Sequence, residues 1–311
     1  MVQTFSPGDE VIVTNCDHEA NIGPWINMEK SGIKVKFWNI NPETLELDLD
    51  VLDKLMTHKT RLVAFTHTSN ILGTINPVKE ITKFVHDRGA MVCVDGVAYA
   101  PHRLVDVQEL DVDFYALSFY KVYGPHYSLL YVKQKHLERL PGINHFFIGN
   151  NEGAYKLQPG NVNYELSYGL LGVTDYIEAV YNHHHSHKSQ SLHEKANSVF
   201  KVFAQQEEKT VSILIDFLKN FKSIRFIGKV SADGNLRVPT ISFIADKMKS
   251  SEIPPLVDKH KIAIRYGDFY ARRLINDLGL AEKEGVVRIS LVHYNTEEEV
   301  EGLLRVLDIV L

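Results

Sequence analysis

One lysine in this chain lies where an apolar strand is expected to end. Residues 113–118 are aromatic and aliphatic, which is typical of a short buried strand, and Gly124 with Pro125 predicts a turn soon afterwards. Lys121 would therefore lie near the carboxyl end of the strand, which faces the ligand crevice in an open α/β sheet. Its apolar neighbours would partly desolvate the amine, lower its pKa and free it to attack a carbonyl. A lone lysine is more often a solvated surface residue, so this prediction depends on the residues around it.

A second apolar run ends in an acid. Residues 91–94 are apolar and are followed by Asp95 and Gly96, the pattern by which a parallel strand delivers one carboxylate to the active edge of a sheet. The spacing to Lys121 leaves room for a crossover and the next strand. An acid and a lysine at nearby strand ends form the pair that pyridoxal phosphate requires. The lysine forms a Schiff base, and the acid keeps the pyridine nitrogen protonated.

These two stretches also carry a resemblance. Residues 94–102 and 121–125 resemble the class V aminotransferase and cysteine desulfurase family, and the similarity runs from about Gly8 to the C-terminus. The resemblance implies pyridoxal 5'-phosphate as cofactor and an α/β fold of the aspartate aminotransferase type. It implies a mostly parallel large-domain sheet with helices on both faces over residues 1–182, and a smaller C-terminal α+β domain over residues 183–311.

The resemblance assigns further cofactor contacts by position. It implies that His18 stacks on the pyridine ring, that Asn70 hydrogen-bonds the phenolic oxygen, and that Ser118 supplies a nearby hydroxyl. Tyr120 stands where the family often has a histidine, and a phenol can still donate to a phosphate. Ala98 replaces a glutamine, which removes one hydrogen bond worth roughly 1 kcal/mol. Without the flanking matches, His18 would more often be an ordinary residue at a helix start, and Asn70 a turn residue.

Contacts with the substrate and with a second subunit are implied nearer the C-terminus. Arg288 resembles the family arginine that clamps the α-carboxylate, a role that suits a planar guanidinium, and Arg265 resembles a second active-site arginine. The alternative for either is a strand-end residue in a surface ion pair. Asn161 stands where a threonine usually reaches the phosphate of the neighbouring subunit, which implies a homodimer.

The cysteines argue against one activity of the family. The chain has only Cys16 and Cys93, and each lies in or at the end of an apolar strand, which predicts buried thiols rather than a disulfide or a metal pair. The position of the desulfurase cysteine falls at or near Tyr270. Persulfide chemistry needs a thiolate nucleophile, so the sequence argues against an ordinary desulfurase. A tyrosine at this position would suit acid-base work or packing on the substrate.

The elements that must position these residues alternate between strand and helix. Strands are predicted at residues 11–15, 35–38, 61–66, 91–95, 113–118 and 128–132, and helices at 49–56, 77–88 and 166–182. This alternation favours a parallel sheet with helices on both faces. A long helix to about Lys222 and a closing helix from Glu297 frame the smaller domain. Its strands are expected near residues 224–227, 240–244, 262–265 and 286–292.

Bulk composition narrows the classes of function. A chain of 311 residues with 44% hydrophobic residues suits one or two α/β domains, and a net charge of -5 without a basic stripe gives no case for nucleic-acid binding. The sequence has no signal peptide or long apolar run, so we expect a cytoplasmic protein without membrane contact. Residues 183–187 are rich in histidine, but adjacent histidines cannot all turn towards one ion. They predict a surface linker and no metal site.

Three functions remain open. The first is a pyridoxal-phosphate enzyme that acts on an amino acid by C–S or other Cβ elimination, transamination or epimerisation, with Lys121 moving the Cα proton. The second is a truncated or catalytically weak relative that serves as a partner subunit or fragment, because the family places a phosphate-binding glycine turn and its helix before the strand that starts here at Glu10. The third is a cysteine desulfurase that uses an external thiol.

Overall fold

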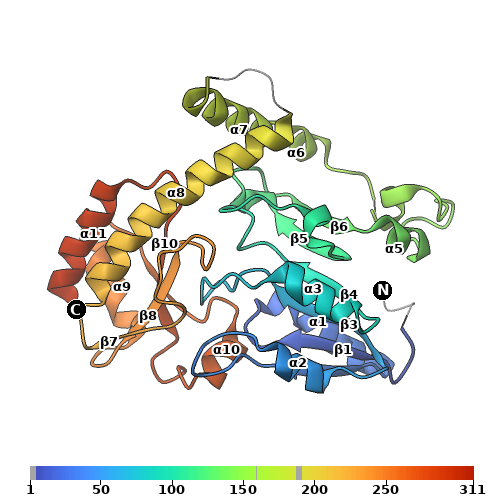
Figure 1. Cartoon of the computed structure of the whole chain (residues 1–311), viewed down its shortest axis with the longest axis horizontal. Helices are drawn as coiled ribbons and strands as arrows, with labels where there is room; N and C mark the ends of the chain where they lie inside the picture. The colour runs from blue at the N-terminus through green and yellow to red at the C-terminus, as the bar shows by residue number, and fades with distance from the viewer. Residues whose placement is uncertain (1–4, 159, 187–190) are drawn as a thin grey trace.

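The larger of two sheets carries the strand ends that the sequence singles out. The computed structural model describes residues 5–158, 160–186 and 191–311. Six strands form this sheet in the order β2-β1-β3-β4-β5-β6 (Figure 1). The first five run parallel and β6 runs antiparallel to β5, which confirms the predicted mostly parallel sheet. The strands are β1 Glu10–Thr14, β2 Lys34–Trp38, β3 Thr60–Thr66, β4 Met91–Asp95, β5 Phe114–Ser118 and β6 Ser128–Val132.

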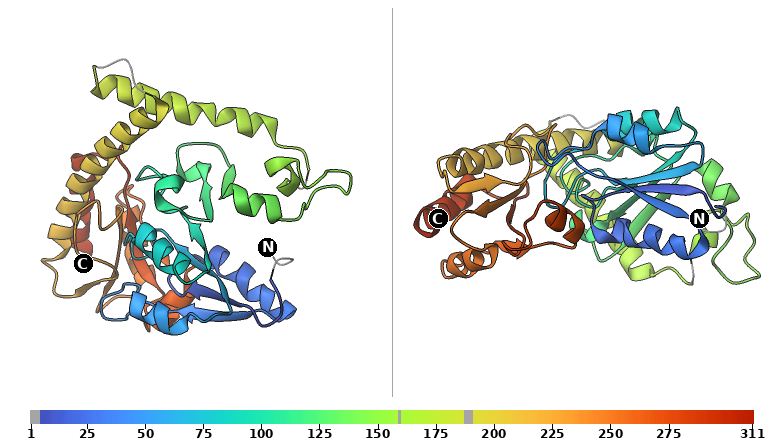
Figure 2. Two further views of the ribbon diagram at one scale, coloured as in Figure 1. Left: turned by 45° about the vertical axis from the view of Figure 1, so that its right-hand side comes forward. Right: turned by 90° about the horizontal axis from the view of Figure 1, so that it is seen from below.

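Helices cover both faces of this sheet, as predicted (Figure 2). Successive strand residues point to opposite faces. Val63 therefore packs in an apolar cluster with residues of α2 and α3, whereas its neighbour Leu62 packs in a cluster with residues of α1. The helices of this half are α1 Gly23–Asn27, α2 Leu49–Leu55, α3 Val78–His86, α4 Val107–Leu110 and α5 Gln134–Arg139, and the 3-10 helices are η2 Glu19–Asn21, η3 Met28–Ser31, η4 Phe119–Lys121 and η5 Gly153–Leu157.

The carboxyl ends of β1, β3, β4 and β5 meet at one edge of the sheet. Strand β1 pairs with β2 on one side and with β3 on the other, so the strand order changes direction beside it. A ligand crevice forms outside the strand ends at such a point. The register places Thr66 beside Asp95, and Asp95 beside Ala116. The strand ends that bear the predicted acid and the predicted lysine are therefore neighbours.

A second, antiparallel sheet forms the other half of the molecule. Its strands follow the order β7-β8-β10-β9. Helices α8, α9 and α11 pack on it around a core that includes Phe243 and Ile289, which confirms the predicted smaller α+β part. The elements are α8 Leu192–Leu218, β7 Ile224–Phe226, β8 Thr240–Ala245, η6 Ser250–Glu252, α9 Ile253–Asp258, β9 Arg265–Gly267, α10 Arg272–Asp277, β10 Val286–Ser290 and α11 Glu297–Val310.

One predicted strand was placed wrongly. The sequence pattern predicts a strand near residues 262–265, but β9 covers Arg265–Gly267. Ile262 and Ile264 pack against the core of the second sheet, whereas pairing with β10 begins at the residue after them. The alternation of apolar residues therefore reflects burial of a connecting segment rather than a strand.

Two helices connect the halves. They are α6 (Tyr164–Gly169) and α7 (Leu171–His184), and α7 packs against α8 through a cluster that includes Tyr181 and Phe203. The predicted domain boundary between residues 182 and 183 falls in the last turn of α7 and stays a prediction. His187 of the histidine run lies outside the described residues. Among those described, no group of three His, Cys, Asp or Glu side chains is arranged to hold a metal ion.

The loop after β3 joins the two sheets. Ser242 Oγ of β8 donates to the Ile71 carbonyl at 2.6 Å, and Thr74 forms a β-bridge with Arg237. A Cβ at Gly73, whose φ is 67°, would lie 2.3 Å from the Thr240 carbonyl oxygen, so a glycine is required where the backbones meet. The loop that leaves the carboxyl edge of the larger sheet is thus fixed against the smaller one.

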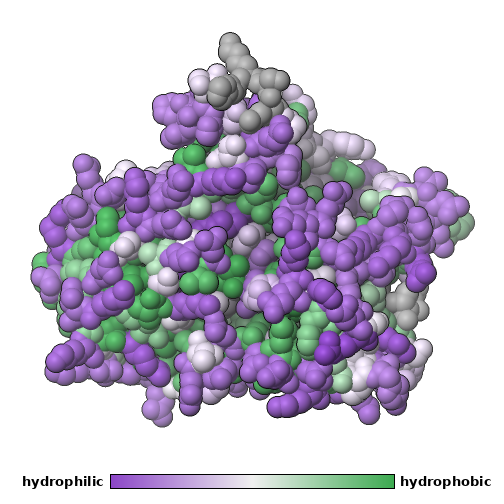
Figure 3. Space-filling model, in the orientation of Figure 1, coloured by the Kyte–Doolittle hydropathy of each residue, from purple (hydrophilic) through white to green (hydrophobic). Residues whose placement is uncertain are grey.

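The face of the molecule seen in Figure 3 mixes polar and apolar side chains. Polar side chains cover much of one face, and apolar side chains are visible among them over the half that contains the second sheet (Figure 3). Within the described ranges, none of the helices combines the length and the apolar character that crossing a bilayer requires.

The packing at Gly96 gives a test of this fold. A Cβ at Gly96 would lie 2.0 Å from the fully buried ring of Tyr115, so Gly96→Ala should lower the free energy of unfolding by about 1 to 3 kcal/mol through overpacking. Outside its chain neighbours and its own helix backbone, Gly172 of α7 has no atom within 4 Å of the same position. Gly172→Ala is therefore the matched control, expected to be neutral or stabilising. Urea unfolding followed by circular dichroism would measure both. Equal stability of the two variants would contradict this packing.

Candidate active site

Four strand ends bring their side chains to one cavity. Lys121 ends η4, directly after β5, and Asp95 is the last residue of β4. His18 follows β1 and caps η2, and Asn70 follows β3. These four residues line a cavity of about 140 Å³. The other lining residues are Ala20, Thr66, Thr68, Val97, Ala98, Ser118 and Tyr120.

The Lys121 amine and the Asp95 carboxylate act on each other. Burial lowers the pKa of Lys121, and the Asp95 charge opposes this effect while the Arg288 charge adds to it. Burial raises the pKa of Asp95, and the charge of Lys121 opposes that rise. Asp95 Oδ1 also accepts the Val97 backbone N–H at 2.8 Å, which fixes the carboxylate. Lys121 as a whole residue nevertheless remains partly exposed to solvent.

The His18 ring is held by backbone contacts and lies beside Tyr270. His18 Nδ1 accepts the Ala20 N–H at 3.1 Å, which leaves Nδ1 unprotonated, and burial lowers the pKa of the ring, so the imidazole is neutral near pH 7. The Tyr270 ring lies 5.2 Å from it, centroid to centroid, and is 73% exposed. The Tyr270 carbonyl accepts the Glu19 N–H at 2.8 Å. The second half of the molecule thus supplies one wall beside His18.

Arg288 reaches the same place from β10. Its Nη1 donates to the Asn70 carbonyl at 3.0 Å, and its guanidinium carbon lies 3.7 Å from the centroid of the Phe269 ring. Asn70 Nδ2 in turn donates to the Phe269 carbonyl at 2.8 Å. Burial lowers the pKa of Arg288 to about 10, and the side chain stays charged at neutral pH. The predicted carboxylate clamp and the predicted cofactor asparagine are therefore in contact.

Several polar atoms of the site are buried without a partner. Asn70 Oδ1, Thr68 Oγ1 and Arg288 Nε make no hydrogen bond within the part of the chain that the structure describes. Leaving such atoms unpaired costs about 1 to 3 kcal/mol each. An acceptor, a hydroxyl and a guanidinium N–H together suit a polar ligand.

Other predicted site residues stand in different positions. Ser118 and Tyr120 line the cavity, and Tyr120 stacks on His126 with the ring centroids 5.1 Å apart. Arg265 lies opposite Arg288 in the strand register but is exposed. Its Nη1 donates to the carbonyl of the preceding residue, Ile264, at 3.2 Å. Asn161 is exposed and lies outside the cavity lining. The roles of Arg265 and Asn161 stay predictions.

Sequence reasoning missed a buried acid beneath the site. Asp17 is 1% exposed, accepts the Asn21 amide at 2.8 Å and accepts the Thr14 hydroxyl. Burial raises its pKa to about 7, and the Asp95 charge adds to the rise. The signal was present, because Asp17 precedes His18 directly at the end of an apolar strand. Only the fold shows that the carboxyl group of Asp17 lies near enough to that of Asp95 for the two to interact.

A stacked pair also escaped prediction. His67 and Tyr99 lie face to face with ring centroids 3.5 Å apart, and His67 Nδ1 hydrogen-bonds the Tyr115 hydroxyl at 2.9 Å. Burial lowers the pKa of His67 to about 3, so this imidazole is neutral. It packs the segment that follows Asp95 against the loop that carries Asn70.

Larger hollows lie elsewhere on the molecule. One of about 560 Å³ is lined by residues at the amino ends of β4 and β5, among them Met91 and Phe114. Ligands of parallel sheets bind at the carboxyl ends of the strands. We therefore assign the site from the convergence of Lys121, Asp95 and His18 rather than from cavity size.

Comparison with known proteins bears on this site. A family model described as aminotransferase class-V matches residues 1–303. The aminotransferase-like protein FGM3 of Gibberella zeae is 43% identical over 314 residues, which cover 99% of this chain and 74% of that protein. The cysteine desulfurase-like protein ustD of Aspergillus flavus is 34% identical over 310 residues, which cover 96% of this chain and 67% of that protein.

A solved structure has the same fold. The cysteine desulfurase CsdA of Escherichia coli aligns with a TM-score of 0.82 at 27% identity, and the alignment covers 99% of this chain and 73% of that one. Nearly the whole of this chain is matched, whereas about a quarter to a third of the length of each of these three proteins lies outside the match.

Titration of Asp17 gives a test of the site. Between about pH 4 and pH 7, Asp17 holds a proton in the folded state that it has released in the unfolded state. The contribution of this proton to the free energy of unfolding is complete below about pH 4 and is lost as the pH rises through about 7. Asp17→Asn keeps a neutral side chain, and its unfolding free energy relative to wild type should rise by about 1 to 4 kcal/mol between pH 5 and pH 8. Urea unfolding at both pH values measures this difference. Asp258→Asn, at an exposed residue, is the control. If the unfolding free energies of the two variants, relative to wild type, changed equally between the two pH values, the raised pKa of Asp17 would be disproved.

Proposed function

The chain belongs to the class V aminotransferase family, a pyridoxal-phosphate-dependent family of enzymes that act on amino acids, and we propose that Lys121 is its cofactor-bearing lysine and moves the Cα proton of the substrate. One observation carries the proposal. Lys121, Asp95 and His18 come from three strand ends to one cavity, and Arg288 reaches its rim from the other sheet.

The residues present fit the cofactor. When bound, pyridoxal phosphate supplies an aldehyde that captures amines and a ring that accepts the electron pair left at Cα. Asp95, whose charge is stabilised by Lys121, would hold the proton of the pyridine nitrogen. The buried and unpaired Asn70 Oδ1 and Thr68 Oγ1 are available to polar atoms of the group. The neutral ring of His18 suits stacking on a flat cofactor.

Lys121 has the properties of a group that first binds a carbonyl and then carries a proton. Burial lowers the pKa of its amine, which raises the fraction of free base near neutral pH. The residue remains partly exposed, which would allow exchange of protons with solvent. The charge of Asp95 opposes this lowering of the pKa and would attract the amine towards the cavity.

Arg288 orients the substrate. Its guanidinium stays charged, one N–H holds the Asn70 carbonyl, and Nε remains unpaired among the described residues. A planar guanidinium binds a carboxylate through two parallel hydrogen bonds. An α-carboxylate held there would place Cα between Arg288 and Lys121. Arg265, exposed on the neighbouring strand, would bind a more distant part of the substrate.

The reaction we propose does not pass through a persulfide. Cys16 and Cys93 are the two cysteines of the chain, both are buried, and burial raises the pKa of each thiol to about 12. Neither can supply the thiolate that persulfide formation needs. Tyr270 lies beside His18 with most of its ring exposed. It would pack on the substrate or serve as an acid.

Removal of the Lys121 amine tests this function. Wild type given pyridoxal phosphate should show a visible absorbance band, and Lys121→Ala should lose the band and at least about a hundredfold of the turnover of a panel of amino acids, measured as released pyruvate, sulfide or keto acid. Lys79→Ala, at an exposed lysine paired with Glu109, is the matched control. A wild type that takes up no cofactor would favour the partner subunit or fragment. Protein-bound persulfide after incubation with L-cysteine would favour a desulfurase.

We also propose that the enzyme is a cytoplasmic homodimer. Tyr164 and Tyr168 lie one turn apart on α6 and are 73% and 76% exposed, and exposed aromatic residues that cluster in this way are typical of interfaces. Asn161 lies just before this helix and is exposed. A second subunit on this surface would have its cofactor phosphate near Asn161 of the first.

The cysteines support the cytoplasmic location. Two free thiols without a disulfide suit a reducing compartment.

The dimer has a direct test. Sedimentation velocity should give twice the chain mass of 35.4 kDa, and Tyr164→Glu with Tyr168→Glu should shift the protein to monomer, because two charges would be buried without partners. Ile309→Glu, at a residue of α11 that is 77% exposed, controls for the added charge. A wild-type monomer at micromolar concentration, or a double variant that remains dimeric, would contradict the proposed interface.

A further inference from the structure

Hydroxyl groups contact both ring nitrogens of His293. The Tyr176 hydroxyl lies 2.6 Å from Nε2, and the Tyr123 hydroxyl lies 3.2 Å from Nδ1. The Tyr123 hydroxyl donates its own proton to the Pro101 carbonyl, so its oxygen accepts from His293 and Nδ1 carries the hydrogen. A neutral imidazole has one donor and one acceptor nitrogen, so Nε2 accepts the Tyr176 proton. The four groups form one directed chain of hydrogen bonds.

The imidazole is fixed between aromatic rings. Phe203 of α8 stacks on it with centroids 3.4 Å apart at an angle of 7°, and the Tyr123 ring lies edge-on at 5.0 Å. Burial lowers the pKa of His293 to about 4, an effect that the charge of Glu207 opposes. The ring is therefore neutral near pH 7, which is the form that the directed chain requires.

This chain of hydrogen bonds joins the turn that follows Lys121 to the segment that follows the strand of Arg288. Tyr123 follows Lys121 by two residues and has a φ of 62°, a left-handed conformation that costs an ordinary residue about 1 to 2 kcal/mol. The bonds at its hydroxyl help to hold this turn. His293 follows β10, the strand that carries Arg288. The lysine turn of one sheet is thus fastened to the arginine strand of the other.

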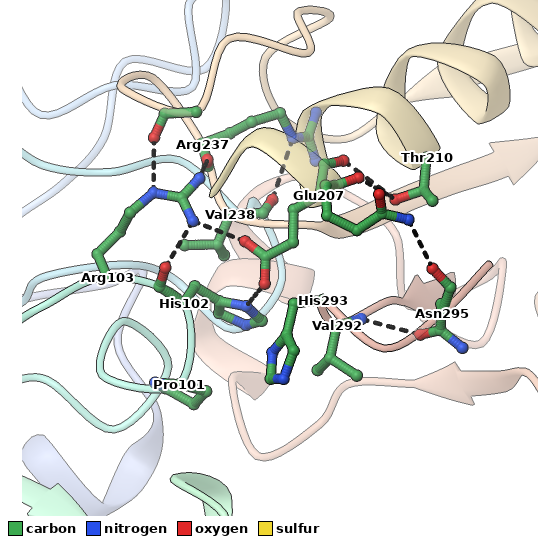
Figure 4. Close-up of polar contacts among 12 residues, drawn as sticks. Pro101, His102, Arg103, Glu207, Thr210, Arg237, Val238, Val292, His293 and Asn295 are labelled. Atoms are coloured by element: carbon green, nitrogen blue, oxygen red, sulfur yellow. Dashed lines mark hydrogen bonds and ion pairs between the residues drawn. The ribbon is translucent and has the colours of Figure 1, made fainter. Parts of the chain in front are cut away.

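A buried acid secures the acceptor end of the chain (Figure 4). Glu207 of α8 is 1% exposed and accepts from His102 Nδ1 at 2.7 Å and from Arg103 Nη1 at 2.6 Å. Pro101, whose carbonyl accepts the Tyr123 proton, directly precedes His102. The segment that follows Asp95 is therefore held on α8, and Tyr123 has a fixed acceptor.

We propose that His293 is a positioning residue that sets the Lys121 amine relative to Arg288, acting through the Tyr123 hydroxyl. The inference rests on the proposed function, in which Arg288 holds the carboxylate of the substrate and Lys121 moves its Cα proton. Loss of the imidazole lets the Lys121 turn relax. The substrate still binds to Arg288, but its Cα is no longer aligned with the amine.

The decisive variant is His293→Phe, which keeps a ring against Phe203 and removes both nitrogens. We expect kcat to fall by about tenfold to a hundredfold, with KM for the amino acid changed by less than about threefold. The pH at which the absorbance of the bound cofactor titrates should shift, because the amine has moved in the field of Asp95. Amide hydrogen exchange at residues 119–124 should accelerate in the cofactor-free protein as well.

Matched variants separate positioning from general packing. Tyr123→Phe should reproduce the losses, and the double variant should lose little more, because the two residues act as one unit. His293→Gln, which offers a donor and an acceptor, should recover part of kcat. Tyr294→Phe makes the same change as Tyr123→Phe at the residue after His293, which is 66% exposed, and should leave kcat unchanged.

The outcomes distinguish this inference from the proposed function. Wild type that turns over amino acids together with a fully active His293→Phe variant, or with unaltered amide exchange at residues 119–124, would overturn the positioning role alone. Wild type that binds no cofactor would overturn the proposed function, and the positioning role with it. A loss confined to thermal stability, with kcat intact in the folded fraction, would reduce His293 to a packing residue.

Discussion

The charge attraction between Asp95 and Lys121 is the interaction on which the site depends. Each group is drawn out of water at the carboxyl edge of the larger sheet, and each reduces the free-energy cost of ionising the other. Parallel pairing of β4 with β5 makes this possible, because it sets the ends of the two strands side by side. The surrounding contacts serve mainly to keep both groups at that edge.

The contacts between the two sheets extend this constraint. The loop after β3 is fixed to β8 by the bond from Ser242 to the Ile71 carbonyl, and the same loop presents Asn70 to Arg288. The segment after Asp95 is fixed to α8 by Glu207. In the function we propose, a substrate held by Arg288 would meet a lysine whose surroundings are fastened to the second sheet. Preorganisation of this kind reduces the entropy that binding and reaction must overcome.

The features of this arrangement that could be predicted are those that depend on short, continuous stretches of sequence. Apolar runs located the strand ends that bear Asp95 and Lys121, because burial of parallel strands imposes that pattern. The pattern failed at residues 262–265, where alternating apolar residues are buried without being a strand. Asp17 and His293 were missed for another reason. Their importance comes from partners far away in sequence, and only folding brings those partners together.

The loop before α10 shows what such a site demands of the backbone. Phe269 and Tyr270 have φ values of 49° and 62°, so two consecutive bulky residues adopt a conformation that favours glycine. Both carry contacts of the site, since the Phe269 ring lies under Arg288 and the Tyr270 ring lies beside His18. At these two positions, the residue that would make the protein most stable therefore differs from the residue that makes the contacts of the site. A search for thermostable variants would select glycine there and would discard the two rings that contact Arg288 and His18.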